Sequence, residues 1–124
     1  MIVGIGIDRV GISRIQRALK RFPHRFVQRI YTPEEYQLAQ DKGVARRLAM
    51  FFAAKEAVSK ALGTGFIGFG MRDIEVRYEA SGKPYIVLHN GADTRAKLLN
   101  IGHIHLSLTD DEDVAMAFAV AESL

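Results

Sequence analysis

Five short segments of this chain have the sequence patterns of strands: in three of them apolar residues recur at every second position, and the other two are nearly continuous apolar runs. The segments are residues 2 to 8, Ile74 to Tyr78, Tyr85 to His89, His103 to Leu108 and Val114 to Ala121. Residues 81 to 84, Ser-Gly-Lys-Pro, predict a turn between the second and third segments, and the acidic residues 110 to 113 predict one before the last. We therefore expect antiparallel pairing. Asp8 ends the first segment, so that strand would present a carboxylate at its carboxyl end.

Four other segments predict helices, and in the first of them the apolar residues are spaced three and four apart. They run from Ser13 to Phe22, from Pro33 to about Gly43, from about Val44 to Leu62, and over residues 92 to 100. We expect Ser13 to cap the first helix and Pro23 to end it. Residues 32 to 35, Thr-Pro-Glu-Glu, form a capping box for the second helix, and Gly63 should close the third.

The mixture of hairpins and helices, without a regular strand-helix-strand rhythm, predicts an α+β fold in which helices pack on antiparallel sheet. The 124 residues are 48% hydrophobic and 25% charged, which suits one domain, residues 1–124, with a single core. No stretch approaches the roughly 20 apolar residues of a membrane span, and the N-terminus lacks a signal-peptide pattern. The chain contains no cysteine, so it has no disulfide framework and no thiolate metal site. We expect a soluble, cytoplasmic protein.

The segment FFAAKEAVSKALGTG, residues 51 to 65, places Glu56 and Lys60 four apart in a helix whose other residues are largely apolar. On an ordinary exposed helix such a pair would be a solvated ion pair worth about 0.3 to 0.5 kcal/mol. Here the surrounding Phe and Ala residues leave little solvent-facing surface. A carboxylate buried in such a segment needs a cation or hydrogen bonds to stay ionised.

A metal ion would supply that cation. With Asp8 as a second oxygen ligand, Glu56 would hold a hard divalent ion such as Mg²⁺, which takes one or two carboxylates and completes its shell with water and phosphate oxygens. Lys60, one turn along the helix, would then meet a phosphate oxygen. The loop Gly63-Thr64-Gly65 would bring backbone N–H groups close to the same phosphates, although a glycine after a helix is more often a simple C-cap.

The basic charge is concentrated in one part of the chain. From Arg9 to Pro33 there are seven Lys or Arg and no acid, whereas the remainder holds ten basic and fourteen acidic residues. Such a local excess predicts a docking surface for an acidic partner rather than general affinity for nucleic acid. Arg14, Arg17 and Arg21 share one face of the first predicted helix, although three arginines alone would also suit a merely solvated face.

These motifs together resemble the holo-acyl-carrier-protein synthases, which are phosphopantetheinyl transferases of a short, single-domain type. Residues 52 to 57, Phe-Ala-Ala-Lys-Glu-Ala, followed by Lys60-Ala61 and Gly63-Thr64-Gly65, are similar to that family's signature. Residues 4 to 8 resemble its opening strand, Gly82-Lys83-Pro84 its middle turn, and residues 105 to 109 its penultimate strand. The resemblance covers nearly the whole chain, with the motifs in order and at suitable spacing.

The resemblance implies Mg²⁺-dependent transfer of the 4'-phosphopantetheine arm from coenzyme A to a serine of apo-acyl carrier protein. Adenosine 3',5'-bisphosphate would be released, and the product would serve fatty acid biosynthesis. Asp8 and Glu56 would place Mg²⁺ on the pyrophosphate, and Lys60 would stabilise charge on the phosphoryl oxygens. The serine proton would pass to Glu56 or to a water on the metal, and the sequence leaves both routes open.

The resemblance further implies a homotrimer with each active site at a subunit boundary, so that each coenzyme A touches two chains. Gly82, Lys83 and Pro84 would lie near the adenine, and His105 near the nucleotide phosphates. The residues alone indicate only a plain hairpin turn and a core histidine at these places. The basic helix would receive the acidic recognition helix of acyl carrier protein. The residues expected to bind that helix are Arg14, Arg17, Arg21 and Arg25.

Three positions depart from the usual pattern of that family. Met50-Phe51 stands where many relatives carry Gly-Arg or Lys-Arg, so a basic contact to a coenzyme A phosphate is either missing or supplied by Arg46 or Arg47. We include Arg46 among the expected coenzyme A ligands. Gly11 and Asp110 stand where a glutamate and a histidine are often found.

Two alternatives from other functional classes stay open on the sequence. A small nucleic-acid-binding module would explain the isoelectric point of about 9.4 and the arginine helix. It leaves Glu56 and Asp8 unexplained, and it should show salt-dependent binding that does not depend on Mg²⁺. A non-catalytic trimeric scaffold would keep all its functions in the Glu56→Gln and Asp8→Asn variants.

Overall fold

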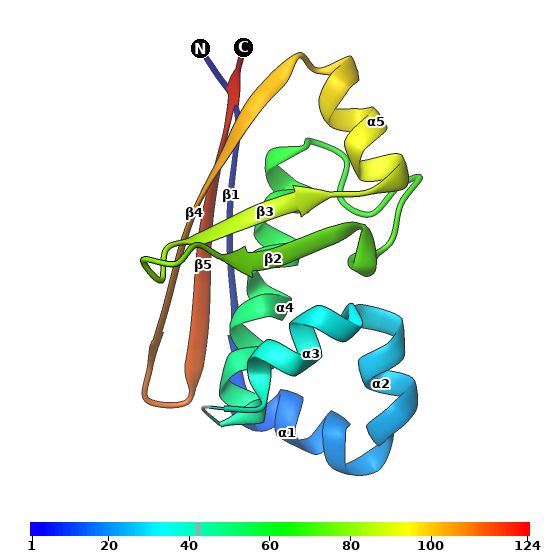
Figure 1. Ribbon diagram of the computed structural model, residues 1–124, viewed down its shortest axis with the longest axis vertical. Helices are drawn as coiled ribbons and strands as arrows, with labels where there is room; N and C mark the ends of the chain where they lie inside the picture. The colour runs from blue at the N-terminus through cyan, green and yellow to red at the C-terminus, as the bar shows by residue number, and fades with distance from the viewer. Residues whose placement is uncertain (42) are drawn as a thin grey trace.

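Two antiparallel sheets pack against one long helix, α4 (Val44–Ala61), in this computed structural model, which describes residues 1–41 and 43–124 (Figure 1). The larger sheet has the strand order β1 (Ile2–Gly11), β5 (Val114–Ser123), β4 (Ile101–Asp111). The smaller sheet is the hairpin of β2 (Ile74–Tyr78) and β3 (Pro84–Leu88). All the strand pairs are antiparallel, which confirms the predicted α+β class.

The shorter helices lie at the two ends of the molecule (Figure 1). At one end, α1 (Ile12–Arg21), α2 (Pro23–Ile30) and α3 (Pro33–Ala39) gather around the start of α4. At the other end, α5 (Asn90–Leu98) lies near the two chain termini, and a 3-10 turn, η1 (Met71–Asp73), leads into β2. Among the described helices, none combines the length and the apolar character that a bilayer span requires.

Two glycines of β1 allow the strand to lie directly on α4. A Cβ atom at Gly4 would overlap the carbonyl oxygen of Ala61, and one at Gly6 would overlap that of Ala57. The contact partners are four residues apart in α4 and the glycines are two apart in β1, so strand and helix run closely side by side. Asp8, the next residue of β1 on that side, is thereby held close to α4.

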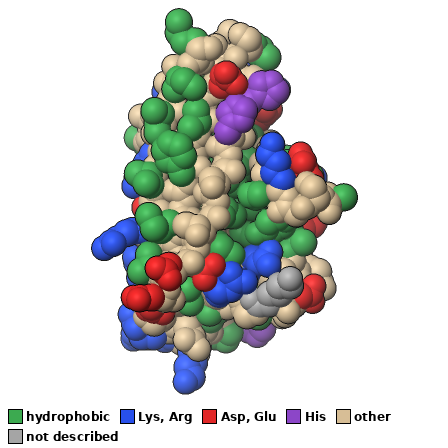
Figure 2. All heavy atoms as spheres, turned by 90° about the vertical axis from the view of Figure 1, so that its left-hand side faces the viewer, with side chains coloured by type: hydrophobic (Ala, Val, Ile, Leu, Met, Phe, Trp, Pro, Cys, Tyr) green, Lys and Arg blue, Asp and Glu red, His purple; other side chains and the backbone are tan. Residues whose placement is uncertain are grey.

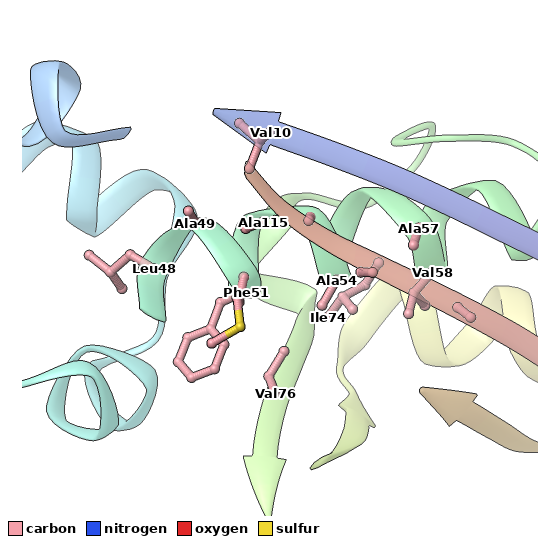
Figure 3. Packing of buried hydrophobic residues seen from close by; sticks show 14 of the residues in the cluster. Val10, Leu48, Ala49, Phe51, Ala54, Ala57, Val58, Ile74, Val76 and Ala115 are labelled. Carbon is pink, nitrogen blue, oxygen red and sulfur yellow. The ribbon is translucent and has the colours of Figure 1, made fainter. Parts of the chain in front are cut away.

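The core lies on both sides of α4. Alanines at 53, 54, 57 and 61 are buried, as are Ala115, Ala117, Ala119 and Ala121 of β5, so helix and sheet approach closely. On the opposite side of α4, Phe51 and Val58 face Ile74 and Val76 of β2 (Figure 3). The helix α4 therefore packs between the two sheets, with small residues toward the large sheet and larger residues toward the hairpin.

A fully buried ionic network joins α3, α4 and β2. Lys55 Nζ donates to Glu35 Oε1 at 2.8 Å and to the carbonyl oxygens of Met71 at 3.0 Å and Ile74 at 2.6 Å, and the side chains of Lys55 and Glu35 are both 0% exposed. Glu35 Oε2 accepts from Val76 N at 2.8 Å. Burial lowers the pKa of Lys55, and the Glu35 carboxylate opposes that shift. The buried cation of this helix is therefore Lys55.

Glu35 also completes the predicted capping box. Its Oε1 accepts from Thr32 N at 2.9 Å, while Thr32 Oγ1 accepts from Glu35 N at 3.1 Å. Thr32 Oγ1 in turn donates to buried Glu75 at 2.9 Å. Burial opposes ionisation of Glu75, but hydrogen bonds from His89, Thr32 and Arg77 outweigh it and hold the pKa of Glu75 below its usual value.

Several predicted helix details were wrong near the amino end. Ser13 does not cap α1: Gly11 occupies that position, and the Ser13 hydroxyl donates instead to Asp113 at 2.6 Å, which ties α1 to the β4–β5 turn. Phe22, expected on the core face, is 47% exposed at the end of α1. Pro23 does end α1, as predicted. It also opens α2, because proline is favoured at the first helical position, and this second helix was not predicted.

Other boundaries moved by a few residues. α3 ends at Ala39, and the part of the predicted helix at residue 42 lies outside the described residues. β1 continues to Gly11, so Asp8 lies within the strand and not at its end. The strands β4 and β5 are longer than predicted, with their turn at residues 112 and 113, and α5 begins at Asn90. The prediction for Gly63 was right: it follows α4 with a φ of 86°, and its N–H donates to Lys60 O at 3.0 Å.

Candidate active site

Asp8 of β1 and Lys60 of α4 form the contact that brings the two elements of the candidate site together. Lys60 Nζ lies 3.2 Å from Asp8 Oδ1 and donates to Ile7 O at 2.9 Å. The alternative of a simple ion pair between Glu56 and Lys60 is not found among the described residues, where Lys60 pairs with Asp8. Lys60 turns toward β1 because the Gly4–Gly6 segment lets the strand backbone lie against the helix.

Glu56 faces the same cluster from α4. Its side chain is partly buried, and burial raises its pKa, with the Asp8 carboxylate adding to the rise and Lys60 and Arg14 opposing it. The four groups therefore share one electrostatic environment at the junction of β1, α1 and α4. The proximity of Arg14 to Glu56 was not predicted, since it depends on how α1 packs on α4.

The pair of carboxylates suits a divalent cation that keeps part of its shell open. The Asp8 carboxylate raises the pKa of Glu56, and a cation between the two carboxylates would relieve that repulsion. Mg²⁺ is commonly held by one or two carboxylates with water and phosphate oxygens. Among the residues that the structure describes, no group of three or more His, Cys, Asp or Glu comes together. Asp8 and Glu56 could therefore hold Mg²⁺ in a shared shell, whereas they could not build a closed structural site.

In the loop after α4, two of the backbone amides that were predicted to approach a phosphate already have acceptors. Gly63 N–H donates to Lys60 O and Gly65 N–H donates to Ser59 O at 3.2 Å, so both amides already serve to end the helix. Thr64 Oγ1 is bonded to Gly65 O at 3.0 Å. The Gly-Thr-Gly segment therefore ends α4, and its contact with a phosphate stays a prediction.

A second group of predicted residues lies in a pocket of about 490 Å³ beyond the start of α4. The pocket is enclosed by the β2–β3 turn, the amino end of α4 and the end of β4, and the following residues line it: Arg46, Arg47, Met50, Tyr78, Gly82, Pro84, Leu108, Thr109 and Asp110. Lys83 lies between two of the lining residues in the exposed turn. The structure thus brings the predicted Arg46 and Gly82-Lys83-Pro84 together.

The two arginines of this pocket have different environments. Arg46 NH1 lies 2.9 Å from Asp110 Oδ1. The Arg47 guanidinium lies over the ring of Tyr78, with its Cζ 5.1 Å from the ring centroid. The Arg47 Nε atom is buried and has no hydrogen-bond partner among the described residues. The sequence left both Arg46 and Arg47 open as the basic contact to a phosphate, and only the folded chain shows that Asp110 lies opposite Arg46.

His105 lies apart from both groups. It is exposed on β4, where its Nε2 is 2.9 Å from Glu122 Oε1 and its ring stacks on His103 with centroids 6.0 Å apart. The core position suggested by the residues alone is wrong. His105 instead belongs to the outer face of the large sheet, which α4 does not cover.

The basic residues form an exposed surface on α1 and α2. Arg14, Arg17, Arg21 and Arg25 are all exposed. Arg21 and Arg25 flank Phe22, with their Cζ atoms 5.4 and 6.0 Å from its ring centroid. The exposed Phe22 was missed because its helical spacing matched the core face, whereas the break before Pro23 turns it outward.

Three comparisons identify what the chain is similar to. A family model described as the 4'-phosphopantetheinyl transferase superfamily matches residues 4–119. The holo-[acyl-carrier-protein] synthase of Methylobacterium sp. (strain 4-46) is 50% identical over 131 aligned positions, which cover 100% of this chain and 96% of that protein.

Solved structures agree in fold. The holo-[acyl-carrier-protein] synthase of Neisseria meningitidis superposes with a TM-score of 0.91 at 41% identity, covering 99% of this chain and 100% of the other. The Helicobacter pylori holo-[acyl-carrier-protein] synthase, solved in complex with coenzyme A, gives 0.85 at 35% identity, covering 95% and 99%. These similarities favour neither a nucleic-acid-binding module nor a scaffold. The chain belongs to the 4'-phosphopantetheinyl transferase superfamily, as its motifs predicted.

Proposed function

We propose that this protein transfers the 4'-phosphopantetheine group from coenzyme A to a serine of apo-acyl carrier protein, with release of adenosine 3',5'-bisphosphate. The observation that carries the proposal is the pair Asp8 and Glu56 beside Lys60, in a chain that belongs to this superfamily. The coenzyme A bound to the Helicobacter pylori relative supports coenzyme A as the donor. We further propose that the reaction depends on Mg²⁺, and that it serves fatty acid biosynthesis in the cytoplasm.

In the proposed reaction the serine oxygen forms a bond to the phosphorus next to pantetheine. The bond from that phosphorus to the bridging pyrophosphate oxygen breaks, and its electrons leave with adenosine 3',5'-bisphosphate. Mg²⁺ held by Asp8 and Glu56 would supply Lewis-acid stabilisation of the charge on these oxygens. Such reactions depend mainly on positioning and electrostatics, because little other covalent chemistry is required of the protein.

The side chains of the cluster have separate tasks in this proposal. Lys60 is exposed, so its ammonium can turn from Asp8 to an oxygen of the transferring phosphoryl group. The serine proton would pass to Glu56 or to a water held at the metal site, both of which would lie beside the attacking oxygen. Asp8 stays fixed by β1, whose backbone is anchored to α4 at Gly4 and Gly6.

We propose that acyl carrier protein docks on the arginine surface of α1 and α2. The four exposed arginines and Phe22 present positive charge around an aromatic side chain, which suits an acidic helix with some apolar residues. Arg14 also faces Glu56, so a carrier protein held there would bring its serine near the carboxylates. Reversal of charge in Arg17→Glu combined with Arg21→Glu should raise the KM for the carrier protein and leave that for coenzyme A nearly unchanged.

We also propose a homotrimer that covers the outer face of the large sheet. This face exposes large apolar side chains along two paired strands, with Ile5 at 59%, Ile7 at 55% and Phe118 at 44% exposure (Figure 2). Such a contiguous apolar surface is typical of a subunit interface. A trimer would bring His105 of β4, on the same face, to a boundary between chains, where it could meet a nucleotide bound to the neighbour. Light scattering of the wild-type chain and of Phe118→Glu tests the assembly.

Intact-mass spectrometry tests the central proposal. Apo-acyl carrier protein is incubated with the protein, coenzyme A and Mg²⁺, and a parallel sample contains EDTA. We expect the carrier protein to gain the mass of one phosphopantetheine arm and the gain to vanish with EDTA. Absence of any gain with several carrier proteins and a folded enzyme would refute the transfer, and a gain that persists in EDTA would refute the dependence on Mg²⁺.

A further inference from the structure

The helix α1, which carries Arg14, Arg17 and Arg21, begins without a capping side chain of its own. Its N-cap residue is Gly11, which has no side chain to accept a hydrogen bond, and its first turn contains no acidic residue. Arg14 lies in that first turn instead. The amino end of a helix has N–H groups without helical partners and a partial positive charge, so an arginine there increases the need for an acceptor from elsewhere.

Asp113, in the turn between β4 and β5, supplies these acceptors. The Ser13 N–H donates to Asp113 Oδ1 at 3.2 Å, and the Ser13 hydroxyl donates to Oδ2 at 2.6 Å. The Ile12 N–H donates to the Asp113 carbonyl oxygen at 2.8 Å. Hydrogen bonds to a carboxylate are stronger than those between neutral groups. One residue from the far end of the chain therefore binds the first two amides of α1.

The register of the large sheet holds Asp113 in this place. Val114 pairs with Gly11 of β1 on one side and with Asp111 of β4 on the other. The helix α1 therefore leaves the sheet directly beside the β4–β5 turn. A Cβ atom at Gly11 would lie 3.9 Å from Asp113 Oδ2 and 4.0 Å from Arg14 Cβ, so the carboxylate and the base of the Arg14 side chain lie close together at the start of the helix.

We propose that Asp113 is a positioning residue, which holds α1 in the orientation that acyl carrier protein needs for transfer. The inference rests on the proposed function and on docking of the carrier protein to the arginine surface. Arg14 also faces Glu56, so the start of α1 lies between that surface and the carboxylate pair. A rotation of α1 would move its arginines relative to the pair and displace the serine of a bound carrier protein from its productive position.

Asp113 lies apart from the residues that we expect to contact coenzyme A. Its carboxylate contacts Ser13 of α1, whereas Asp110 is the residue of the same hairpin that lines the pocket of Arg46 and Arg47. Loss of the Asp113 carboxylate should therefore weaken the productive binding of the carrier protein and leave the binding of coenzyme A nearly unaltered.

Transfer assays that vary the carrier protein and coenzyme A separately distinguish this role from a merely structural one. Asp113→Ala removes the carboxylate but keeps the carbonyl oxygen that accepts from Ile12 N. We expect the KM for the carrier protein to rise roughly three- to tenfold, because loss of a helix cap changes an equilibrium by about that factor. The KM for coenzyme A should stay close to that of the wild type. Calorimetric titration with apo-acyl carrier protein alone should show the same weakening without any turnover.

Three further variants control the experiment. Asp111→Ala removes a neighbouring exposed carboxylate at the end of β4 and should leave both KM values near those of the wild type. Asp113→Asn keeps an oxygen that can accept from Ser13, so its effect should be smaller than that of Asp113→Ala. Gly11→Ser in the Asp113→Ala background supplies a local cap, because the extended backbone at Gly11 suits serine, a preferred N-cap residue. This double variant should recover most of the lost affinity for the carrier protein.

The possible failures can be told apart. An unchanged KM for the carrier protein in Asp113→Ala, or equal increases in both KM values, would overturn the positioning role and leave the proposed transfer standing. No recovery on addition of Gly11→Ser would show that Asp113 does not act through the cap of α1, and it would overturn the inference as well. A folded wild-type protein that modifies none of several carrier proteins would overturn the proposed function itself.

Discussion

Lys55 and Glu56 are neighbours in the sequence, but they belong to two regions in which charged groups are arranged differently. Lys55 lies in the interior, where Glu35 and two backbone carbonyl groups satisfy its ammonium group completely. Glu56 lies on the adjoining face of α4, partly exposed, with a raised pKa and a second carboxylate nearby. A helix turns by about 100° per residue, so adjacent positions can serve the core and the site separately.

The difference shows how charge is arranged for stability and how it is arranged for binding. The buried network pairs its charges and leaves little for a ligand to contact. In the Asp8–Glu56 cluster, by contrast, the two carboxylates repel each other, and a bound cation would relieve that repulsion. Loss of a charge from the first region should therefore damage folding, whereas loss of a charge from the second should damage activity.

The largest effect should follow Lys55→Met. The substitution leaves the Glu35 carboxylate buried without its cation, and breaking a buried pair in this way costs about 3–5 kcal/mol. Urea unfolding followed by circular dichroism would measure the change in the free energy of unfolding. Lys60→Met is the matched control from the same helix, and its effect on stability should stay within about 1 kcal/mol because its ion pair is exposed.

A double variant sharpens this prediction. Glu35→Gln removes the uncompensated charge and keeps one of the two acceptor oxygens, so either Thr32 N or Val76 N retains its acceptor. Lys55→Met combined with Glu35→Gln should therefore be more stable than Lys55→Met alone. A double variant that is no more stable than the single one would show that the loss comes from packing and not from the unpaired carboxylate.

Asp8→Asn and Glu56→Gln should lower the transfer activity and leave the stability nearly unchanged, in contrast to Lys55→Met. Each removes one negative charge from the candidate metal site, and we expect the rate of phosphopantetheine transfer to fall roughly a hundredfold or more. Both variants should unfold at urea concentrations close to the wild-type midpoint. Transfer assays at several Mg²⁺ concentrations provide the measurement, and a variant with near wild-type turnover would remove its residue from the metal site.

Local features of the fold could be predicted from the sequence because they depend on neighbouring residues. The capping box at Thr32, the glycine end of α4 and the hairpin turn at Gly82 each need only a few adjacent residues, and each was confirmed. The role of Ser13 was mistaken because its partner, Asp113, is 100 residues away in the chain. The helix α2 was also missed, although Pro23 is a residue favoured at the first helical position.

The sequence motifs predicted which residues form the site but not how those residues pair. Residue types and the family resemblance led to Asp8, Glu56 and Lys60, and the structure brings these three together. Which partner each one faces could not be predicted, because Lys60 could reach Glu56 on its own helix or Asp8 across it. The different environments of Arg46 and Arg47 could not be predicted for the same reason, since Asp110 and Tyr78 are more than thirty residues further along the chain.

The third effect concerns the support of Asp8. Gly6→Ala places a methyl group against the carbonyl oxygen of Ala57, so β1 must move away from α4. Overpacking of this kind costs typically about 1–3 kcal/mol, and the displaced Asp8 should also lower the transfer rate. Gly70→Ala is the control, because a Cβ atom there would meet nothing within 4 Å. Equal unfolding midpoints for the two variants would contradict the close approach of strand and helix.

The smallest effect is the contribution of Glu56 to the pH dependence of stability. Its pKa is raised in the folded protein, so the folded state holds the proton more tightly than the unfolded state. Below the ordinary value of 4.5 both states are protonated and Glu56 contributes nothing. As the pH rises from there through the raised pKa, ionisation of Glu56 makes the wild type progressively less stable relative to Glu56→Gln. The difference should stay below about 1 kcal/mol, because water screens a partly exposed group.

Urea unfolding of both proteins from pH 3.5 to 8 at constant ionic strength measures that difference. We expect the stability of Glu56→Gln minus that of the wild type to increase above pH 4.5 and then to level off. Addition of Asp8→Asn to both proteins should reduce the increase, because the Asp8 carboxylate contributes to the raised pKa of Glu56. An increase of the same size without the Asp8 charge would mean that burial alone perturbs Glu56, and the argument for a shared cation between the two carboxylates would lose its electrostatic basis.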